Sequence, residues 1–110
     1  MIRNPILPGF NPDPCICRAG DDYYIATSTF EWFPGVQIHH SRDLVHWRLL
    51  THALREPRLL DMRGVPSSGG IWAPALSWRD GLFWLCYTVV HQHEAVTKDT
   101  PNYLITAASI

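Results

Sequence analysis

The chain has 110 residues, of which 46% are hydrophobic and 17% charged, and its formal net charge is −1. This composition excludes a disordered chain, and it provides no basic stripe for nucleic acid or an anionic membrane surface. The length predicts one domain or part of one. The amino-terminal run has no apolar segment of the secretory type and no stretch is long enough to cross a membrane. A cytoplasmic location is therefore the default expectation, provided that Met1 is the true start.

Strand signals dominate the chain, because alternating, β-branched and aromatic runs recur between turn residues. The predicted strands cover Cys15–Arg18, Tyr23–Thr29, Val36–His40, Trp47–Leu54, Ala73–Trp78, Leu82–Val90 and Tyr103–Ser109. Two of them, Tyr23–Thr29 and Leu82–Val90, are apolar enough to be buried. The connection from Arg55 to Ile71 is long and rich in Gly and Ser, with one helical turn near Leu59–Met62, and long loops of this kind are often functional.

A weak internal repeat relates two segments at a constant offset. Residues 14–26 and residues 74–86 both run through a proline, a short strand, a Gly/Asp turn and an aromatic-rich strand. A repeat of several antiparallel strands at such a period is typical of propeller blades. Asp13 falls opposite Ala73 in this alignment, so the repeat unit itself does not require a carboxylate there.

The three cysteines are Cys15, Cys17 and Cys86, an odd number without C-x-x-C spacing. This pattern is neither a disulfide framework nor a zinc site. All three are predicted to be small buried hydrophobic residues.

Two groups of histidines, His39-His40 and His91-Gln92-His93, raise the question of a metal site. Two histidines alone do not define a metal site, and solvent-exposed histidines are the favoured interpretation. No cluster of oxygen ligands for calcium is evident either. The sequence therefore predicts no metal and no cofactor.

Asp13 lies between two prolines in the run Gly9-Phe10-Asn11-Pro12-Asp13-Pro14. Each proline fixes its own φ and pushes the preceding residue toward extended geometry, so Asp13 is expected at a rigid, extended start of a strand. Taken alone, the motif also fits a turn aspartate that bonds to nearby backbone.

The run GFNPDPCICRAGDDYYIATSTFEWFPGVQIHHSRDLVHW, followed by DMRGVPSSGGIWAP, resembles the amino-terminal part of family 43 glycoside hydrolases, and most of all the β-xylosidases. The resemblance covers nearly the whole chain. It implies an all-β fold, a five-bladed β-propeller with the active site at one end of the central channel. It also implies hydrolysis of glycosidic bonds with inversion, using an Asp base, a second Asp that tunes pKa, and a Glu acid.

By the resemblance, Asp13 matches the general base, and Phe30 and Trp72 match residues that line the sugar pocket. Both aromatics are expected on loops, where their faces would cover the C–H faces of a pyranose ring. Asp43, in Ser41-x-Asp43-Leu44-x-x-Trp47, is interpreted as a turn cap. The remaining aromatics singled out here are expected to be packing residues: Trp32, Phe33, Trp47, Trp78 and Trp84.

The chain departs from the family pattern because it ends before the second Asp and the general acid would occur. The acidic residues Glu31, Glu56 and Glu94 are present, but none has the sequence context of the acid. The chain is therefore expected to be the amino-terminal part of a catalytic propeller, with blade 1 at about residues 13–54 and a partial blade 2 at about residues 72–110. Alone, it is expected to be inactive.

Three functions follow as expectations for the parent protein. The first is an exo-acting β-xylosidase on xylo-oligosaccharides in xylan catabolism. The second is an α-L-arabinofuranosidase of the same family, acting on arabinosides. The third is a non-catalytic carbohydrate-binding or interaction module. A homo-oligomeric parent without a nucleic-acid or membrane partner is a further expectation.

Overall fold

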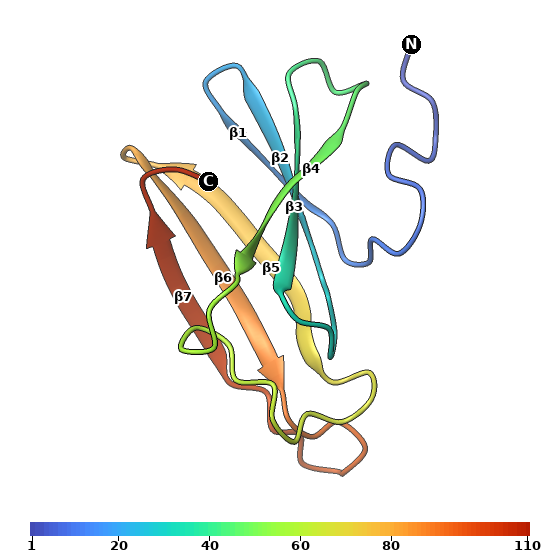
Figure 1. Cartoon of the computed structure of the whole chain (residues 1–110), viewed down its shortest axis with the longest axis vertical. Coiled ribbons are helices and arrows are strands. Elements are labelled where there is room, and N and C mark those ends of the chain that lie inside the picture. The colour runs from blue at the N-terminus through green and yellow to red at the C-terminus, as the bar shows by residue number, and fades with distance from the viewer.

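The structure, a computed structural model, describes residues 1–110 and consists of strands and irregular segments (Figure 1). The predicted all-β class is confirmed. The strands form two antiparallel sheets in which sequence neighbours pair, with orders β1-β2-β3-β4 and β5-β6-β7. Their bounds are β1 Cys15–Ala19, β2 Asp22–Thr27, β3 Gly35–Ser41, β4 Arg48–Leu54, β5 Gly70–Arg79, β6 Leu82–Val90 and β7 Asn102–Ala107.

The internal repeat is confirmed by the strand registers. Cys15 pairs with Ala26 between β1 and β2, and Ala75 pairs with Cys86 between β5 and β6. The offset of 60 residues holds through both hairpins, down to the pairs Ala19–Asp22 and Arg79–Leu82. The repeated sequence pattern therefore specifies the same hairpin twice.

The hydrophobic core lies between the two sheets. Period-2 alternation on β6 turns Phe83, Leu85, Tyr87 and Val89 to this interior, where they are buried. The ring of Tyr24 on β2 meets the ring of Phe83 edge-on, with centroids 5.1 Å apart. The core thus joins the first sheet to the second.

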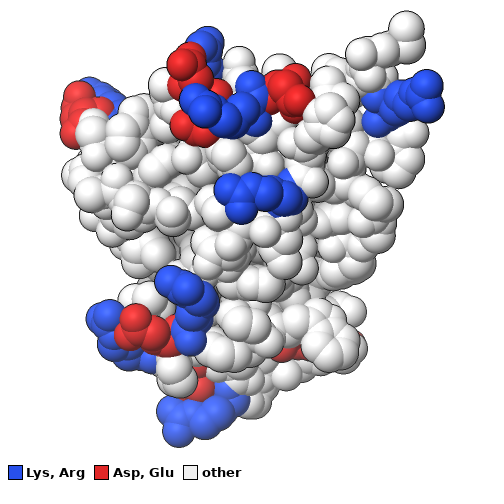
Figure 2. All heavy atoms as spheres, turned by 45° about the horizontal axis from the view of Figure 1, so that its top comes forward, with Lys and Arg blue, Asp and Glu red and all other residues white.

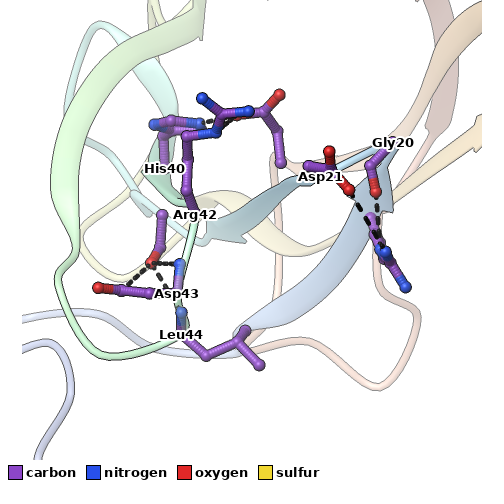
Figure 3. Close-up of polar contacts among 9 residues, drawn as sticks. Gly20, Asp21, His40, Arg42, Asp43 and Leu44 are labelled. Atoms are coloured by element: carbon purple, nitrogen blue, oxygen red, sulfur yellow. Dashed lines mark hydrogen bonds and ion pairs between the residues drawn. The ribbon is translucent and has the colours of Figure 1, made fainter.

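The turns at the upper end of Figure 1 follow their local chemistry. Asp80 and Gly81 both have positive φ, 52° and 76°, which is the combination that a two-residue hairpin between right-twisted strands needs. At the end of β3, Ser41 Oγ accepts a hydrogen bond from Leu44 N at 2.9 Å (Figure 3). In the turn that follows, Asp43 Oδ1 accepts from His46 N at 2.8 Å. The interpretation of Asp43 as a turn cap is confirmed, and the hydrogen bond from the His46 side chain contributes most to lowering the pKa of Asp43.

The strand β5 begins earlier than the sequence predicts, at Gly70 rather than Ala73. A bulge between Trp72 and Ala75 absorbs Pro74, which cannot donate to the ladder. Gly70 has a φ of 76°, and a Cβ there would lie 2.2 Å from the Phe30 carbonyl oxygen. Only glycine allows the backbones to approach this closely, so the Gly that suggested a loop starts a strand. The expected turn near Leu59–Met62 lies slightly earlier, where Leu59 N and Leu60 N donate to Glu56 O.

The cysteines are free, and the prediction that all three are buried is wrong for Cys86. Cys17 is buried, Cys15 is half-buried and Cys86 is exposed. Cys86 alternates with the inward-facing residues of β6, so it lies on the outer face of its sheet. On that face only Val90, at the end of the strand, is buried, so the prediction of burial for Leu82–Val90 holds for the inner face and for Val90.

The expected packing role of the remaining aromatics is wrong for Trp32 and Phe33, which are exposed, Trp32 by 67%. Trp78 is partly exposed, but its ring packs on the buried ring of Phe83, with centroids 4.4 Å apart. Trp47 and Trp84 are half-buried and donate their indole N–H to Leu44 O and Arg79 O. These hydrogen bonds hold each indole against a nearby turn, which fits the expected structural role of both residues.

The expectation of solvent-exposed histidines is wrong for His39, which is buried on β3. Its neighbour His40 points to the other face of the strand, where its Nε2 lies 2.7 Å from Asp22 Oδ1. Adjacent strand residues cannot converge on one ion, and no group of three or more His, Cys, Asp or Glu is arranged to hold a metal. His91 and His93 are half-buried.

Figure 2 shows charged side chains in small groups separated by uncharged surface, some groups with both signs and others with Lys or Arg only. Several charged residues of the chain form local ion pairs: Arg18–Asp21, Arg42–Asp22, Arg58–Glu56, Arg63–Asp61 and Arg79–Asp80. Exposed pairs of this kind contribute little to stability. The structure contains no helix that could span a membrane.

Candidate functional site

The three site residues predicted from the sequence come from the start of β1, the segment after β2 and the start of β5. The last two segments meet at the lower end of the molecule in Figure 1, opposite the capped turns. Asp13 precedes β1, Phe30 follows β2, and Trp72 lies within β5. The expectation that Trp72 lies on a loop is therefore wrong, because β5 extends through it.

Asp13 has a left-handed backbone, with φ 50°, and the prediction of an extended residue is wrong. Aspartate tolerates this region better than most residues, and a second contact holds it there. Ser28 Oγ donates to Asp13 Oδ2 at 2.6 Å, and Ser28 N donates to Pro12 O at 3.0 Å. Ser28 is only 1% exposed, so a buried donor fixes the direction of an exposed carboxylate.

The carboxylate of Asp13 keeps one oxygen available. The only hydrogen bond recorded to this side chain is at Oδ2, and Oδ1 has no bond from the chain. A carboxylate held by one oxygen and open at the other can accept a proton from a bound water. The interpretation as a turn aspartate is not supported, since its partner is a side chain 15 residues away.

Phe30 is joined directly to the start of β5. Phe30 N donates to Ile71 O and Ile71 N donates to Phe30 O, both at 2.9 Å. Phe30 also has a left-handed backbone, with φ 48°, and its ring lies 5.7 Å from that of Phe10. Because Trp72 follows Ile71 directly, the bridge brings both predicted aromatic site residues to one place in the fold. Strained backbone of this kind clusters at functional sites.

Trp72 is held by the connection that precedes β5. Its Nε1 donates to Ser68 O at 2.9 Å, and its ring centroid lies 5.9 Å from that of His93. Lys98 Nζ lies 6.0 Å from the Trp72 centroid, a cation–π distance. The Gly/Ser-rich connection thus holds one of the residues predicted for the site, and a functional role for this long loop stays a prediction.

Sequence reasoning missed Ser28, and it assigned Glu31 and His93 no role. Glu31 accepts hydrogen bonds from Ser68 N at 3.1 Å and Ser67 Oγ at 3.4 Å, and His93 Nε2 lies 3.0 Å from Ser67 O. No spacing in the chain relates these residues, because their partners are brought close only by the pairing of Phe30 with Ile71. No sequence signal could have found them.

The family model for glycosyl hydrolases family 43 matches residues 2–110 of this chain. A beta-xylosidase of Bacillus subtilis is 63% identical over 109 residues, which are 99% of this chain and 20% of that protein. A xylosidase/arabinosidase 43B of Humicola insolens is 63% identical over 110 residues, all of this chain and again 20% of that protein.

A solved structure agrees with these sequence matches. The crystal structure of a xylan beta-1,4-xylosidase from Bacillus halodurans is 64% identical, with a TM-score of 0.98, over 100% of this chain and 21% of that one. The chain therefore spans about a fifth of the length of the relatives it matches. Because the family model covers nearly the whole length of the chain and its fold agrees with that of a solved member, the chain belongs to glycosyl hydrolase family 43.

Proposed function

We propose that the whole protein is an exo-acting β-xylosidase that releases xylose from the non-reducing ends of xylo-oligosaccharides with inversion. The observation that carries the proposal is the Asp13 carboxylate, which buried Ser28 holds and which is open at Oδ1. The segment that carries Ser28 continues to Phe30, and Phe30 pairs with Ile71, the neighbour of Trp72. The similarity to proteins named as xylosidases supports the choice of sugar.

Asp13 acts as the general base in this proposal. It removes a proton from a water that attacks the anomeric carbon on the face opposite the leaving group. An inverting enzyme needs a carboxylic acid about 6.5–9.5 Å away to protonate the leaving oxygen. That acid, and the Asp that tunes its pKa, belong to the part of the protein outside this chain.

Phe30 and Trp72 line the sugar pocket in this proposal. Aromatic faces cover the C–H faces of a pyranose ring and exclude water from the reacting centre. The reciprocal backbone bonds between Phe30 and Ile71 support this role, because they tie the two aromatics to one rigid bridge.

The two sheets would be the first blade and most of the second blade of a five-bladed propeller. The repeated hairpin register supports this arrangement. The 110-residue chain alone would then have one wall of the site and no turnover.

An α-L-arabinofuranosidase is the second candidate, since a relative that is 63% identical is named a xylosidase/arabinosidase. Both substrates present a five-carbon sugar. The test is to assay the full-length protein on an aryl β-xyloside and on an aryl α-L-arabinofuranoside. A higher kcat/KM on the xyloside supports the proposal, and a higher value on the arabinofuranoside favours the second candidate. Binding of xylo-oligosaccharide without turnover of either substrate would instead indicate a non-catalytic carbohydrate-binding module.

A further inference from the structure

A single carboxylate, Glu31, connects the two segments that carry the aromatic residues. Glu31 follows Phe30, whose backbone pairs with Ile71. Its Oε2 accepts from Ser68 N at 3.1 Å and its Oε1 lies 3.4 Å from Ser67 Oγ. The side chain thus spans from the segment after β2 to the connection before β5.

The bond to Ser68 continues to the Trp72 indole. The Ser68 backbone donates its N–H to Glu31, and its carbonyl accepts from Trp72 Nε1 at 2.9 Å. Ser68 has a φ of 62°, a backbone state that a serine holds only when its surroundings enforce it. His93 Nε2 supports the same turn through Ser67 O at 3.0 Å. Removing the Glu31 carboxylate would release the turn that orients the indole.

Glu31 is poorly suited to be the missing general acid. A general acid must carry a proton on one oxygen, which turns that oxygen into a donor. Both oxygens of Glu31 are engaged by Ser67 and Ser68, so neither is free to give a proton to a leaving group. These contacts instead suit a residue that positions its neighbours, Ser67 and Ser68.

We propose that Glu31 is a positioning residue, which holds the Ser67-Ser68 turn and thereby fixes the Trp72 indole against the bound sugar. This role rests on the proposed function, because it takes Trp72 as a wall of the sugar pocket. It makes substrate binding, rather than proton transfer, the step that depends on Glu31.

The test uses the full-length protein and an aryl β-xyloside. Glu31→Ala should raise KM and the inhibition constant of free xylose about tenfold, with kcat within about threefold, since bonds to a charged acceptor are lost. Glu31→Gln keeps one acceptor oxygen for Ser68 N and should recover most of the affinity. In a Trp72→Ala background, Glu31→Ala should add no further loss. Glu56→Gln, at an exposed carboxylate paired with Arg58, is the matched control.

Different results separate this role from the proposed function. A large effect of Trp72→Ala with no effect of Glu31→Ala would overturn the role of Glu31 alone. Equal losses from Glu31→Ala with and without Trp72 would also overturn it, because the residues would then act independently. No effect of Trp72→Ala would overturn the sugar-binding role of Trp72 and this role with it. If Glu31→Ala does not fold, Ser67→Ala, which removes one of the two contacts to Glu31, carries the comparison with and without Trp72.

Discussion

For Asp13, the sequence predicted a functional role but not the backbone conformation. Its position between two prolines and its absence from the repeated unit drew attention to it, and the resemblance to family 43 gave it the role of general base. Its backbone could not be predicted, because the local preference of a residue before proline for extended geometry is overridden by a buried hydroxyl 15 residues away. Ser28 lies in an apolar run that predicts a strand, and a buried serine in such a run is interpreted as a packing residue.

Replacing Asp13 by Asn tests the base. The amide keeps the shape but cannot take a proton from the attacking water, so kcat of the full-length protein on an aryl xyloside should fall by ~10²–10⁴-fold. Binding of xylose should be largely retained. A variant that keeps more than about a tenth of the wild-type kcat would remove Asp13 from this role, since general-base catalysis contributes more than that.

Ser28→Ala tests the support of the base. Loss of the 2.6 Å bond frees the carboxylate to rotate, and we expect kcat to fall roughly tenfold, the scale of one hydrogen bond to a charged group. The control is Thr27→Val, because Thr27 Oγ1 is buried and has no hydrogen-bond partner. If both variants turn over at the wild-type rate, Ser28 does not position Asp13.

At the scale of elements, alternating, aromatic and β-branched runs between turn residues predicted every strand, and most boundaries lie within two residues of those observed. The error at the start of β5 came from Gly70, which marks a loop by composition. Here it permits a close backbone approach, and a bulge after Trp72 accommodates Pro74 within the strand. Whether a glycine or proline has such a role depends on a neighbouring segment of the fold, and the local sequence does not indicate which segment that is.

The strand β3 carries a buried histidine that predicts a pH dependence of stability. Burial, together with the nearby His52, lowers the pKa of His39 below its usual value, and burial also lowers the pKa of His52. The unfolded chain then binds protons more readily than the folded one below pH ~6.5. The free energy of unfolding should therefore be highest above that pH and fall as pH is lowered through it.

The measurement is the unfolding free energy of the full-length protein between pH 8 and pH 5. This range stays above the ordinary pKa of the carboxylates, so their protonation contributes little. His39→Gln should reduce the slope, because Gln does not titrate. An identical slope in wild type and variant would show that His39 is not held neutral in the fold.

At the scale of the whole molecule, the chain leaves apolar surface uncovered. Ile16, Leu49, Tyr103 and Leu104 are exposed, and β7 is an edge strand with no partner on its outer side. Repeat units bury their faces against neighbours, and open edges are templates for aggregation. The repeat was predictable from the sequence, whereas the unequal covering of the two faces of β6 was not.

The isolated 110-residue chain should accordingly be loosely folded or aggregated and hydrolyse no xyloside. Near-ultraviolet circular dichroism, a melting curve and a xylosidase assay on the purified chain check this. A monomer with a sharp cooperative transition and measurable turnover would contradict both the unpaired-blade arrangement and the location of the acid outside this chain.

The most direct test of the proposed chemistry is to follow hydrolysis of an aryl β-xyloside by the full-length protein with proton NMR, and to identify the first anomer released. An inverting xylosidase with Asp13 as base should release α-xylose first, which then mutarotates, and the Asp13→Asn variant should release almost none. Release of β-xylose first, or of no xylose by the wild-type protein, would contradict the account.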